Sequence, residues 1–243
     1  MSWASQFANL LYPPACPLCR APLSDSRETS PPICEPCAQG LERVGVPVCV
    51  RCGVGLPGAF DARACCQACR MHPRAFELAR APWRYGGTGQ ALIRQFKYHQ
   101  RWRLGRWLAA HMAATAQAAV PLDDIAAVVP VPLHWAARRL RGSNPAEELA
   151  VLVAQALQKP CLPRALRRQR WTPSQTRLSW RQRQRNVRGA FTARSSLIDG
   201  GSLLLIDDVL TSGATAGACA QALKDAGARQ VFVVTAARTP LSE

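Results

Sequence analysis

Four Cys-x-x-Cys pairs within the first 70 residues restrict the fold of this chain more than any other feature of its sequence. The pairs are Cys16 with Cys19, Cys34 with Cys37, Cys49 with Cys52, and Cys66 with Cys69. Fourteen residues separate the first two pairs and 13 separate the last two, so one unit occurs twice in tandem. Two such pairs can complete a tetrahedral Cys₄ site with no open position. We therefore predict a double zinc ribbon with two structural zinc ions.

Several alternatives stay open for these cysteines. The pairs could be redox-active or disulfide-bonded, although no strand-helix pattern surrounds any of them. The two sites could be cross-braced instead of sequential, and Cys65 could replace Cys66. The amino-terminal residues Met1 to Phe7 lack the basic and apolar regions of a secretory signal. This favours a reducing, cytoplasmic location, in which paired cysteines bind metal more often than they form disulfides.

Length and composition predict a soluble protein with either one large domain or one domain and a small appendage. The chain has 243 residues, of which 48% are hydrophobic and 19% charged, so it is not an intrinsically disordered chain. Its longest apolar runs, such as Ile125–Leu133, are much shorter than the roughly 18 residues of a membrane-spanning helix. We expect the ribbon at 12–70, a linker at 71–80 and the main domain at 81–243.

A net charge of +16 and an isoelectric point of about 10.3 indicate anionic partners such as phosphates or nucleic acid. Arginine accounts for 28 of the 31 basic residues, and its planar guanidinium suits bidentate contact with phosphate. A genomic preference for arginine could produce this count, but it would not remove acidic residues. Between Leu149 and Ile198 there are ten arginines, one lysine and no acidic residue. We therefore predict that this segment contacts phosphates.

Residues 164–188 are the centre of that basic segment. Nine arginines alternate here with two tryptophans, and the weak hydrophobic periodicity is typical of a long loop that faces an anion. A solvated basic face with two packing tryptophans is the alternative. The predicted nucleic-acid contacts are Lys97, Trp171, Arg177, Trp180, Arg181, Arg183 and Arg185.

The main domain shows strand and helix patterns in alternation. Ala126–Val131 is an apolar run that predicts a buried strand, and Ala146–Leu157 predicts a helix after it. Arginines follow this strand at its carboxyl end, which is where ligands bind in open α/β sheets. The pattern therefore predicts a parallel sheet with a ligand site at that edge.

The segment Gly200–Arg238 predicts a second unit of strand, turn, helix and strand. Its first strand leads to the adjacent carboxylates Asp207 and Asp208, and the small-residue turn Thr211–Thr215 then opens a helix. Backbone N–H groups at a helix N-terminus, together with nearby hydroxyls, favour a phosphate. The turn lacks the glycine and lysine spacing of a Walker A loop and the glycines of a dinucleotide fingerprint. We predict a phosphate cup formed by Thr211, Ser212, Gly213, Ala214 and Thr215.

The ten residues Ile206–Thr215, Ile-Asp-Asp-Val-Leu-Thr-Ser-Gly-Ala-Thr, resemble the phosphoribosyl-diphosphate signature of type I phosphoribosyltransferases. The resemblance implies that Asp207 and Asp208 accept hydrogen bonds from the ribose 2′ and 3′ hydroxyls and form the catalytic pair. It also implies that Thr211–Thr215 hold the 5′-phosphate. Helix capping and turn formation are the alternative for the aspartates, but capping would occupy only one of the two carboxylates.

From about residue 12 to its end, the chain also resembles the ComF family of competence-associated proteins. Two positions depart from the family pattern, with Ser143 in place of a usual Phe and Pro145 in place of a usual Gln. The resembling features are the double zinc ribbon, Phe96-Lys97-Tyr98, Val-Pro-Val-Pro-Leu-His134, Arg139-Leu-Arg-Gly-Ser-Asn144, Thr172-Pro-Ser-Gln175-Thr-Arg-Leu178, Arg185-Asn186-Val-Arg-Gly-Ala-Phe191 and the phosphate cup.

This family resemblance implies an α/β fold, namely a type I phosphoribosyltransferase-like parallel sheet flanked by helices, with an N-terminal double zinc ribbon. It implies a cytoplasmic factor that supports uptake of single-stranded DNA in natural transformation, with other DNA-uptake proteins as further partners. An active enzyme would displace diphosphate from C1 of 5-phosphoribosyl diphosphate, and Mg²⁺ with Arg139 and Arg141 would stabilise the leaving group. The alternatives are a non-catalytic module that binds single-stranded nucleic acid and a sensor of the phosphoribosyl ligand.

Overall fold

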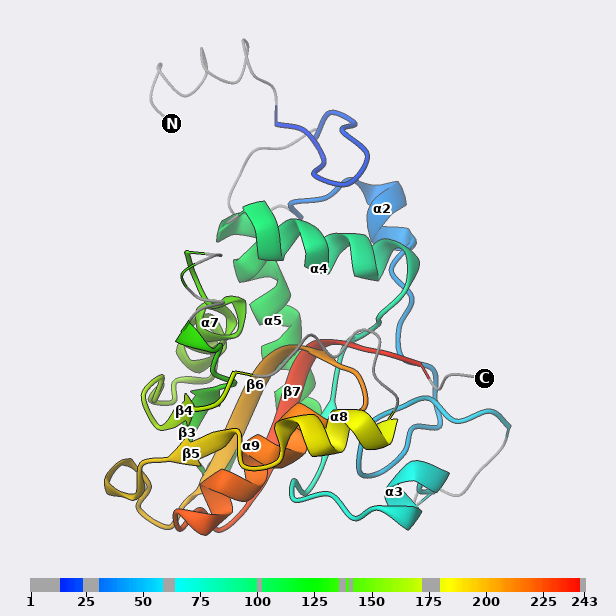
Figure 1. Cartoon of the computed structure of the whole chain (residues 1–243). Helices are drawn as coiled ribbons and strands as arrows, with labels where there is room; N and C mark the ends of the chain where they lie inside the picture. The colour runs from blue at the N-terminus through cyan, green and yellow to red at the C-terminus, as the bar shows by residue number, and fades with distance from the viewer. Residues whose placement is uncertain are drawn as a thin grey trace.

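The computed structural model describes residues 14–23, 31–58, 64–99, 102–135, 139, 142–171 and 180–240. At its centre is a sheet in the order β1-β7-β6-β3, with β2 also beside β7, and all of these strand pairs are parallel. Figure 1 labels β3, β6 and β7 of this sheet. The strands are β1 (Ala79–Arg80), β2 (Trp83–Arg84), β3 (Ile125–Pro130), β6 (Ser202–Leu210) and β7 (Val231–Arg238). The predicted parallel α/β sheet is confirmed.

Helices cover both faces of this sheet (Figure 1). A two-stranded antiparallel sheet of β4 (Leu166–Arg168) and β5 (Phe191–Ala193) lies against α9 (Ala214–Asp225). On one face are α4 (Gly87–His99), α5 (Trp102–Ala119) and α7 (Pro145–Leu157). On the other are α8 (Trp180–Val187), α9 (Ala214–Asp225), β4 (Leu166–Arg168) and β5 (Phe191–Ala193). Two short 3₁₀ turns are η1 (Leu122–Asp124) and η3 (Ser195–Leu197).

Side chains of β6 alternate between the two hydrophobic clusters of the domain. Leu204 and Ile206 pack in the cluster that contains α5 and α7, whereas Leu203 and Leu205 pack in the cluster that contains α9. Strands that are covered on both faces must be apolar at every position, which explains why this run has no polar alternation. The same alternation assigns opposite faces to the two acidic residues that follow.

Each half of the ribbon contains one short helix, α2 (Glu35–Gln39) or α3 (Gln67–Met71). Ile33 and Leu41 of the first half belong to the same cluster as α5. In the second half the buried cysteines form a cluster of their own around Val54. This half is docked on β1, since the Ala79 N–H donates to the Arg51 carbonyl at 2.7 Å.

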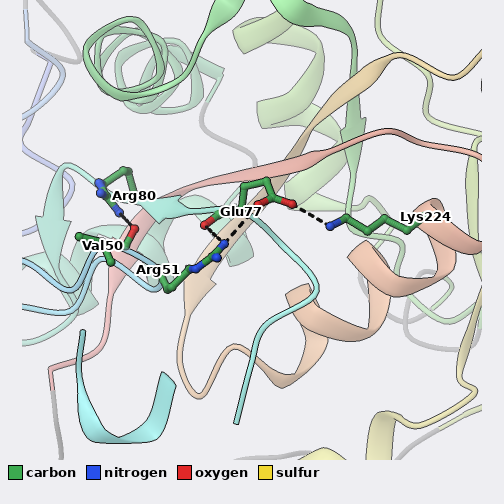
Figure 2. A network of polar contacts seen from close by, with 5 residues as sticks. All are labelled: Val50, Arg51, Glu77, Arg80 and Lys224. Atoms are coloured by element: carbon green, nitrogen blue, oxygen red, sulfur yellow. Dashed lines mark hydrogen bonds and ion pairs between the residues drawn. The ribbon is translucent and has the colours of Figure 1, made fainter. Parts of the chain in front are cut away.

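Close approach of the second ribbon half to the sheet depends on Gly53. Its φ is +63°, and a Cβ at this position would lie 2.3 Å from the Ala79 carbonyl oxygen. Polar contacts add to this backbone contact, as Figure 2 shows for Val50, Arg51 and their partners. Any larger residue at position 53 would push the ribbon away from the sheet.

Three segments differ in detail from the expectations. In the expected linker at 71–80, Phe76 is 0% exposed and packs with α9, while the domain boundaries themselves stay a prediction. The prediction of an irregular loop at 164–188 was wrong where the structure has β4 and α8. Residues 172–179 of this segment lie outside the described part. Strand β6 continues through the acidic pair to Leu210, because its pairing with β7 extends to that residue.

None of the helices in the described ranges has the length and apolarity needed to span a membrane.

Candidate functional site

The eight paired cysteines form two clusters. In each cluster the four Sγ atoms lie within 4.8 Å of one another. A tetrahedral zinc ion with Zn–S distances of about 2.3 Å requires sulfurs about 3.8 Å apart. The Sγ distances of 3.4 Å between Cys19 and Cys34 and 3.6 Å between Cys52 and Cys66 are close to that requirement. The two clusters therefore fit two structural zinc ions.

The grouping of the cysteines is sequential. The first cluster consists of the first two pairs, and the second consists of Cys49, Cys52, Cys66 and Cys69. Cys65 lies next to the second cluster, with its Sγ 3.9 Å from that of Cys49, but Cys66 is the cluster member. Spacing alone left both the order and the choice between Cys65 and Cys66 open, because it does not say which turns meet in space.

The acidic pair lies near the carboxyl end of β6. Asp208 forms an ion pair with Lys97 of α4, with 2.9 Å between Nζ and Oδ1, and the two side chains are 16% and 19% exposed respectively. Asp207 turns back to its own strand and accepts a hydrogen bond from the Asp208 N–H at 2.8 Å. Since neighbouring side chains of a strand point to opposite faces, Asp208 is on the α4 side and Asp207 on the α9 side. Lys97, a candidate for nucleic-acid contact in the sequence, thus has a partner in the acidic pair.

Electrostatics distinguish the two carboxylates. Loss of hydration, with a further contribution from the charge of Asp208, raises the pKa of Asp207 to about 8. Burial alone would lower the pKa of Lys97, but the charges of Asp208 and Asp207 outweigh it and hold that pKa above its ordinary value. Asp207 therefore carries a proton at neutral pH and can donate as well as accept a hydrogen bond.

The 211–215 loop, defined as Thr211–Thr215, joins β6 to α9. Gly213 has a φ of +76° and occupies the N-cap position of α9, a conformation that favours glycine. The Ser212 hydroxyl accepts a hydrogen bond from the Ala214 N–H at 3.3 Å, and Thr211, Ser212 and Thr215 are partly exposed. The loop therefore presents hydroxyls at a helix N-terminus, beside the acidic pair, where the helix dipole favours an anion.

The remaining candidates are spread over the same end of the domain and α8. Arg139 is exposed, and its guanidinium lies over the ring of Trp135, 5.9 Å from the ring centroid. Arg183 and Arg185 lie on α8, and Trp171 is 59% exposed just after β4. Of Trp180 and Arg181 only the place in α8 is described. Arg141 and Arg177 lie outside the described residues.

A groove of about 820 Å³ runs between α9, the segment after α8 and the segment before β1. Its lining includes the basic residues Arg185 and Arg188 of the α8 segment and Arg74 of the segment before β1, together with Gly213 of the 211–215 loop. The α9 side is formed by small residues such as Gly217, together with Gln221 and the acidic Asp225. The lining of the groove therefore holds three arginines against one acidic residue, and the groove reaches the 211–215 loop at Gly213.

Three residues of this region escaped the sequence analysis. Arg74 falls in the expected linker, and a single charged residue in a linker gives no sign that it lines a groove. Trp135 is 65% exposed beyond the carboxyl end of β3, and its i, i+4 spacing to Arg139 was the available signal. Arg238 follows an apolar run at the end of β7, and its contacts with Cys52 and Leu210 depend on segments far apart in the sequence.

Comparison with known proteins gives matches over nearly the whole chain. Residues 7–70 match the model of the double zinc ribbon domain. The DNA utilization protein YhgH of Salmonella typhi is 31% identical over 236 residues, which are 95% of this chain and 99% of that protein. YhgH of Escherichia coli K12 is 30% identical over 239 residues, with the same coverage. Competence protein F of Haemophilus influenzae is 26% identical over 211 residues, 85% of this chain and 90% of that protein.

Two solved structures are similar to part of the chain. The allosteric regulatory enzyme of purine biosynthesis has a TM-score of 0.36 and 22% identity, over 54% of this chain and 25% of that one. Glutamine phosphoribosylpyrophosphate amidotransferase from B. subtilis has a TM-score of 0.40 and 21% identity, over 58% of this chain and 30% of that one. The match thus spans less than a third of the length of either enzyme.

Metal analysis of the purified chain is expected to give two zinc ions, one for each cysteine cluster. Structural zinc contributes about 10–16 kcal/mol to the folding of small ribbons, so chelation should unfold residues up to about 70 before the sheet. Circular dichroism with limited proteolysis would follow the two parts separately. Fewer than one zinc per chain, in protein purified without added metal, would contradict the ribbon.

The raised pKa of Asp207 predicts a pH-dependent stability that Asp207→Asn removes. The folded state binds this proton more tightly than the unfolded chain, in which the pKa has its ordinary value of 3.8. The tighter binding stabilises the folded state at low pH, and this stabilisation is lost as the pH rises towards about 8. The stability of the variant relative to the wild type should therefore increase between pH 5 and pH 8, by on the order of 2 kcal/mol after allowance for partial exposure. Urea unfolding of both proteins at several pH values measures this difference. The pH dependence that comes from the ribbons is the same in both proteins and therefore cancels. Parallel stability curves would show that Asp207 titrates normally.

Proposed function

The chain belongs to the family of the DNA utilization protein YhgH and competence protein F, and we propose that it binds 5-phosphoribosyl diphosphate at the acidic pair and the 211–215 loop. In this proposal the protein acts in the cytoplasm and supports the uptake and use of single-stranded DNA, in line with the names of these relatives. The two cysteine clusters support a reducing compartment, since they fit metal and not disulfides.

One observation carries the ligand part of the proposal. Two carboxylates and a helix N-terminus with three hydroxyls lie at the carboxyl end of the same parallel strand, β6. Strand β3 ends at Pro130, opposite Ile206, so the acidic pair lies just beyond the end of its neighbour. A phosphorylated sugar needs this combination, because its phosphate takes N–H and O–H donors while its ring hydroxyls take carboxylate acceptors.

In the proposed complex Asp208 accepts from one ribose hydroxyl while Lys97 holds its carboxylate in place. Asp207 approaches the second hydroxyl from the α9 side, and the 211–215 loop binds the 5′-phosphate. Mg²⁺ binds mainly through substrate phosphates and water, and it would neutralise charge on the leaving diphosphate. Arg139, exposed beyond β3, and Arg141 are proposed to contact the same group.

If ribosyl transfer takes place, an acceptor nucleophile forms a bond to C1 as the bond from C1 to the diphosphate oxygen breaks. The diphosphate leaves with the electron pair, and its charge is stabilised by positioned cations and not by a covalent intermediate. The exposed ring of Trp135, near the same sheet edge, offers a face on which a planar acceptor could stack.

Binding of single-stranded nucleic acid is a second candidate function, and the groove beside α9 favours it. Arg185 and Arg188 are exposed on its wall, and Trp171 is exposed in the neighbouring segment. Arginines along a groove follow the phosphates, and an exposed aromatic ring stacks on a base without sequence preference. The two functions are compatible, because the groove meets the 211–215 loop only at Gly213.

Replacement of Asp207 and Asp208 together by Asn should abolish measurable binding of 5-phosphoribosyl diphosphate in the presence of Mg²⁺. A hydrogen bond to the charged carboxylate of Asp208 contributes roughly 1.5–3 kcal/mol and one to the protonated Asp207 roughly 0.5–1.5 kcal/mol, so loss of both should weaken binding by at least about tenfold. Titration calorimetry of wild type and variant measures this. Asp199→Asn, a change on the loop before β6, is the control and should bind like the wild type. Equal affinities, or no binding by the wild type, would reject the site.

Single-stranded DNA should bind with an affinity that falls steeply with salt. Each phosphate contact contributes about −0.7 to the log–log salt slope, so Arg185→Gln with Arg188→Gln should flatten the slope by about 1.4. The control, Arg94→Gln with Arg106→Gln, removes the same charge from α4 and α5 on the other face and should keep the slope. Trp171→Ala should cost about 1–3 kcal/mol without a change of slope. Fluorescence anisotropy at several salt concentrations would measure all three, and identical slopes for the two arginine variants would exclude the groove.

A further inference from the structure

Arg238, the last residue of β7, connects the second cysteine cluster to the 211–215 loop. Its side chain is almost fully buried, with 7% exposure. On the ribbon side, Nε donates to the Cys52 carbonyl at 3.0 Å, and Nη2 lies 3.6 Å from the Cys52 Sγ. On the loop side, Nη1 donates to the carbonyls of Leu210 at 3.0 Å and Thr211 at 2.6 Å. One guanidinium therefore contacts a metal-binding cysteine and the first residues of the loop.

The charge of this guanidinium has its counterpart in the cysteine cluster. Within the described chain, the hydrogen-bond acceptors of Arg238 are backbone carbonyls and the Cys52 sulfur, with no carboxylate among them. A buried charge is costly unless an opposite charge compensates it. Four thiolates around Zn²⁺ carry a net charge of about −2. Two more arginines lie at this cluster: Arg80, which donates to the Val50 carbonyl at 3.1 Å, and Arg74, which hydrogen-bonds to Cys69.

The loop contacts of Arg238 restrict two peptide planes. A trans peptide is planar, and its N–H points away from its carbonyl oxygen. When Arg238 holds the Leu210 and Thr211 carbonyls, the N–H groups of Thr211 and Ser212 must therefore point away from Arg238. These are the first donors of the loop, and their direction decides whether they converge on one anion.

A separate connection holds the far end of the loop-helix unit (Figure 2). Arg51, between the cysteines of the third pair, lies 3.2 Å from Oε2 of Glu77, whose Oε1 accepts from Lys224 of α9 at 2.7 Å. The hydrogen bond from Lys224 lowers the pKa of Glu77, and Arg51 adds to this effect. This network joins the ribbon to the last turn of α9 and does not touch the loop, so it offers a matched control for Arg238.

We propose that Arg238 is a positioning residue through which the metal-loaded second cysteine cluster holds the 211–215 loop in its anion-binding conformation. The effect on the loop backbone is independent of any ligand. Only its consequence for affinity depends on the proposed binding of 5-phosphoribosyl diphosphate. The proposal gives the second zinc site a function beyond stabilising its own ribbon, since zinc occupancy then controls the order of the loop.

Backbone ¹⁵N relaxation of the full zinc-loaded chain tests the first part. In the wild type we expect order parameters of about 0.85 at Ser212 and Gly213. In the Arg238→Lys variant we expect values below about 0.6 at the same two residues. Lysine keeps the charge, but its single nitrogen cannot serve Cys52 and Thr211 together. Arg51→Gln should leave the loop as ordered as in the wild type. An ordered loop in Arg238→Lys, at two zinc ions per chain, would overturn the proposal.

Loss of the second zinc should have the same effect as loss of Arg238. Cys69→Ser in the full chain is expected to reduce zinc to one per chain and to lower the order parameters of the same two residues. If this variant does not fold, the comparison of Arg238→Lys with Arg51→Gln still decides the question. An ordered loop in a folded Cys69→Ser variant with one zinc would show that the cluster does not act through Arg238.

Calorimetry with 5-phosphoribosyl diphosphate and Mg²⁺ separates this proposal from the proposed function. We expect at least tenfold weaker binding by Arg238→Lys and unchanged binding by Arg51→Gln. A disordered loop with wild-type affinity would reject the consequence for binding. Absence of binding by every variant, wild type included, together with a disordered loop in Arg238→Lys, would reject the ligand and leave the structural coupling in place.

Discussion

Pairing of β6 with β7 is the constraint on which the rest of the structure depends. Its register places Asp207 opposite Thr235 and Leu210 opposite Arg238, so the end of one strand meets the end of the other. The acidic pair, the loop and the arginine that joins them to the ribbon are neighbours for this reason. A register shift by one residue would exchange the two faces and separate all of these contacts.

The charged groups at this end of the molecule differ in how deeply they are buried. Two partly buried carboxylates face opposite sides of the sheet, one paired with Lys97 and the other protonated at neutral pH. Behind the loop, the buried guanidinium of Arg238 is compensated by the cysteine cluster. Arg185 and Arg188, which line the groove, are exposed. The 211–215 loop therefore lies between the second cysteine cluster and the basic groove, and the two proposals together would link the stability of the ribbon to the affinity of the site.

Local patterns were sufficient wherever the chemistry is carried by neighbours in the sequence. Cys-x-x-Cys pairs, the run Leu203–Ile206 and the small residues of Thr211–Thr215 each predict their own structure, because spacing and apolarity act within a few residues. Prediction failed where a longer-range contact decides. The basic segment was expected to be a loop, yet β4 pairs with β5 and α8 packs on α9. The ion pair of Lys97 with Asp208 was likewise not indicated by any local pattern, and nucleic-acid contact by Lys97 stays a prediction.

By itself, the sequence determined two metal-binding cysteine units, a parallel α/β domain and a turn suited to a phosphate after two carboxylates. The tertiary structure alone decided which cysteines meet, that Cys66 and not Cys65 completes the second cluster, and which side of the sheet each aspartate faces. It also decided that Arg238 reaches both Cys52 and Thr211. The physical reason is that these contacts join segments up to 186 residues apart, whose meeting depends on strand register and on the packing of the ribbon against the sheet edge.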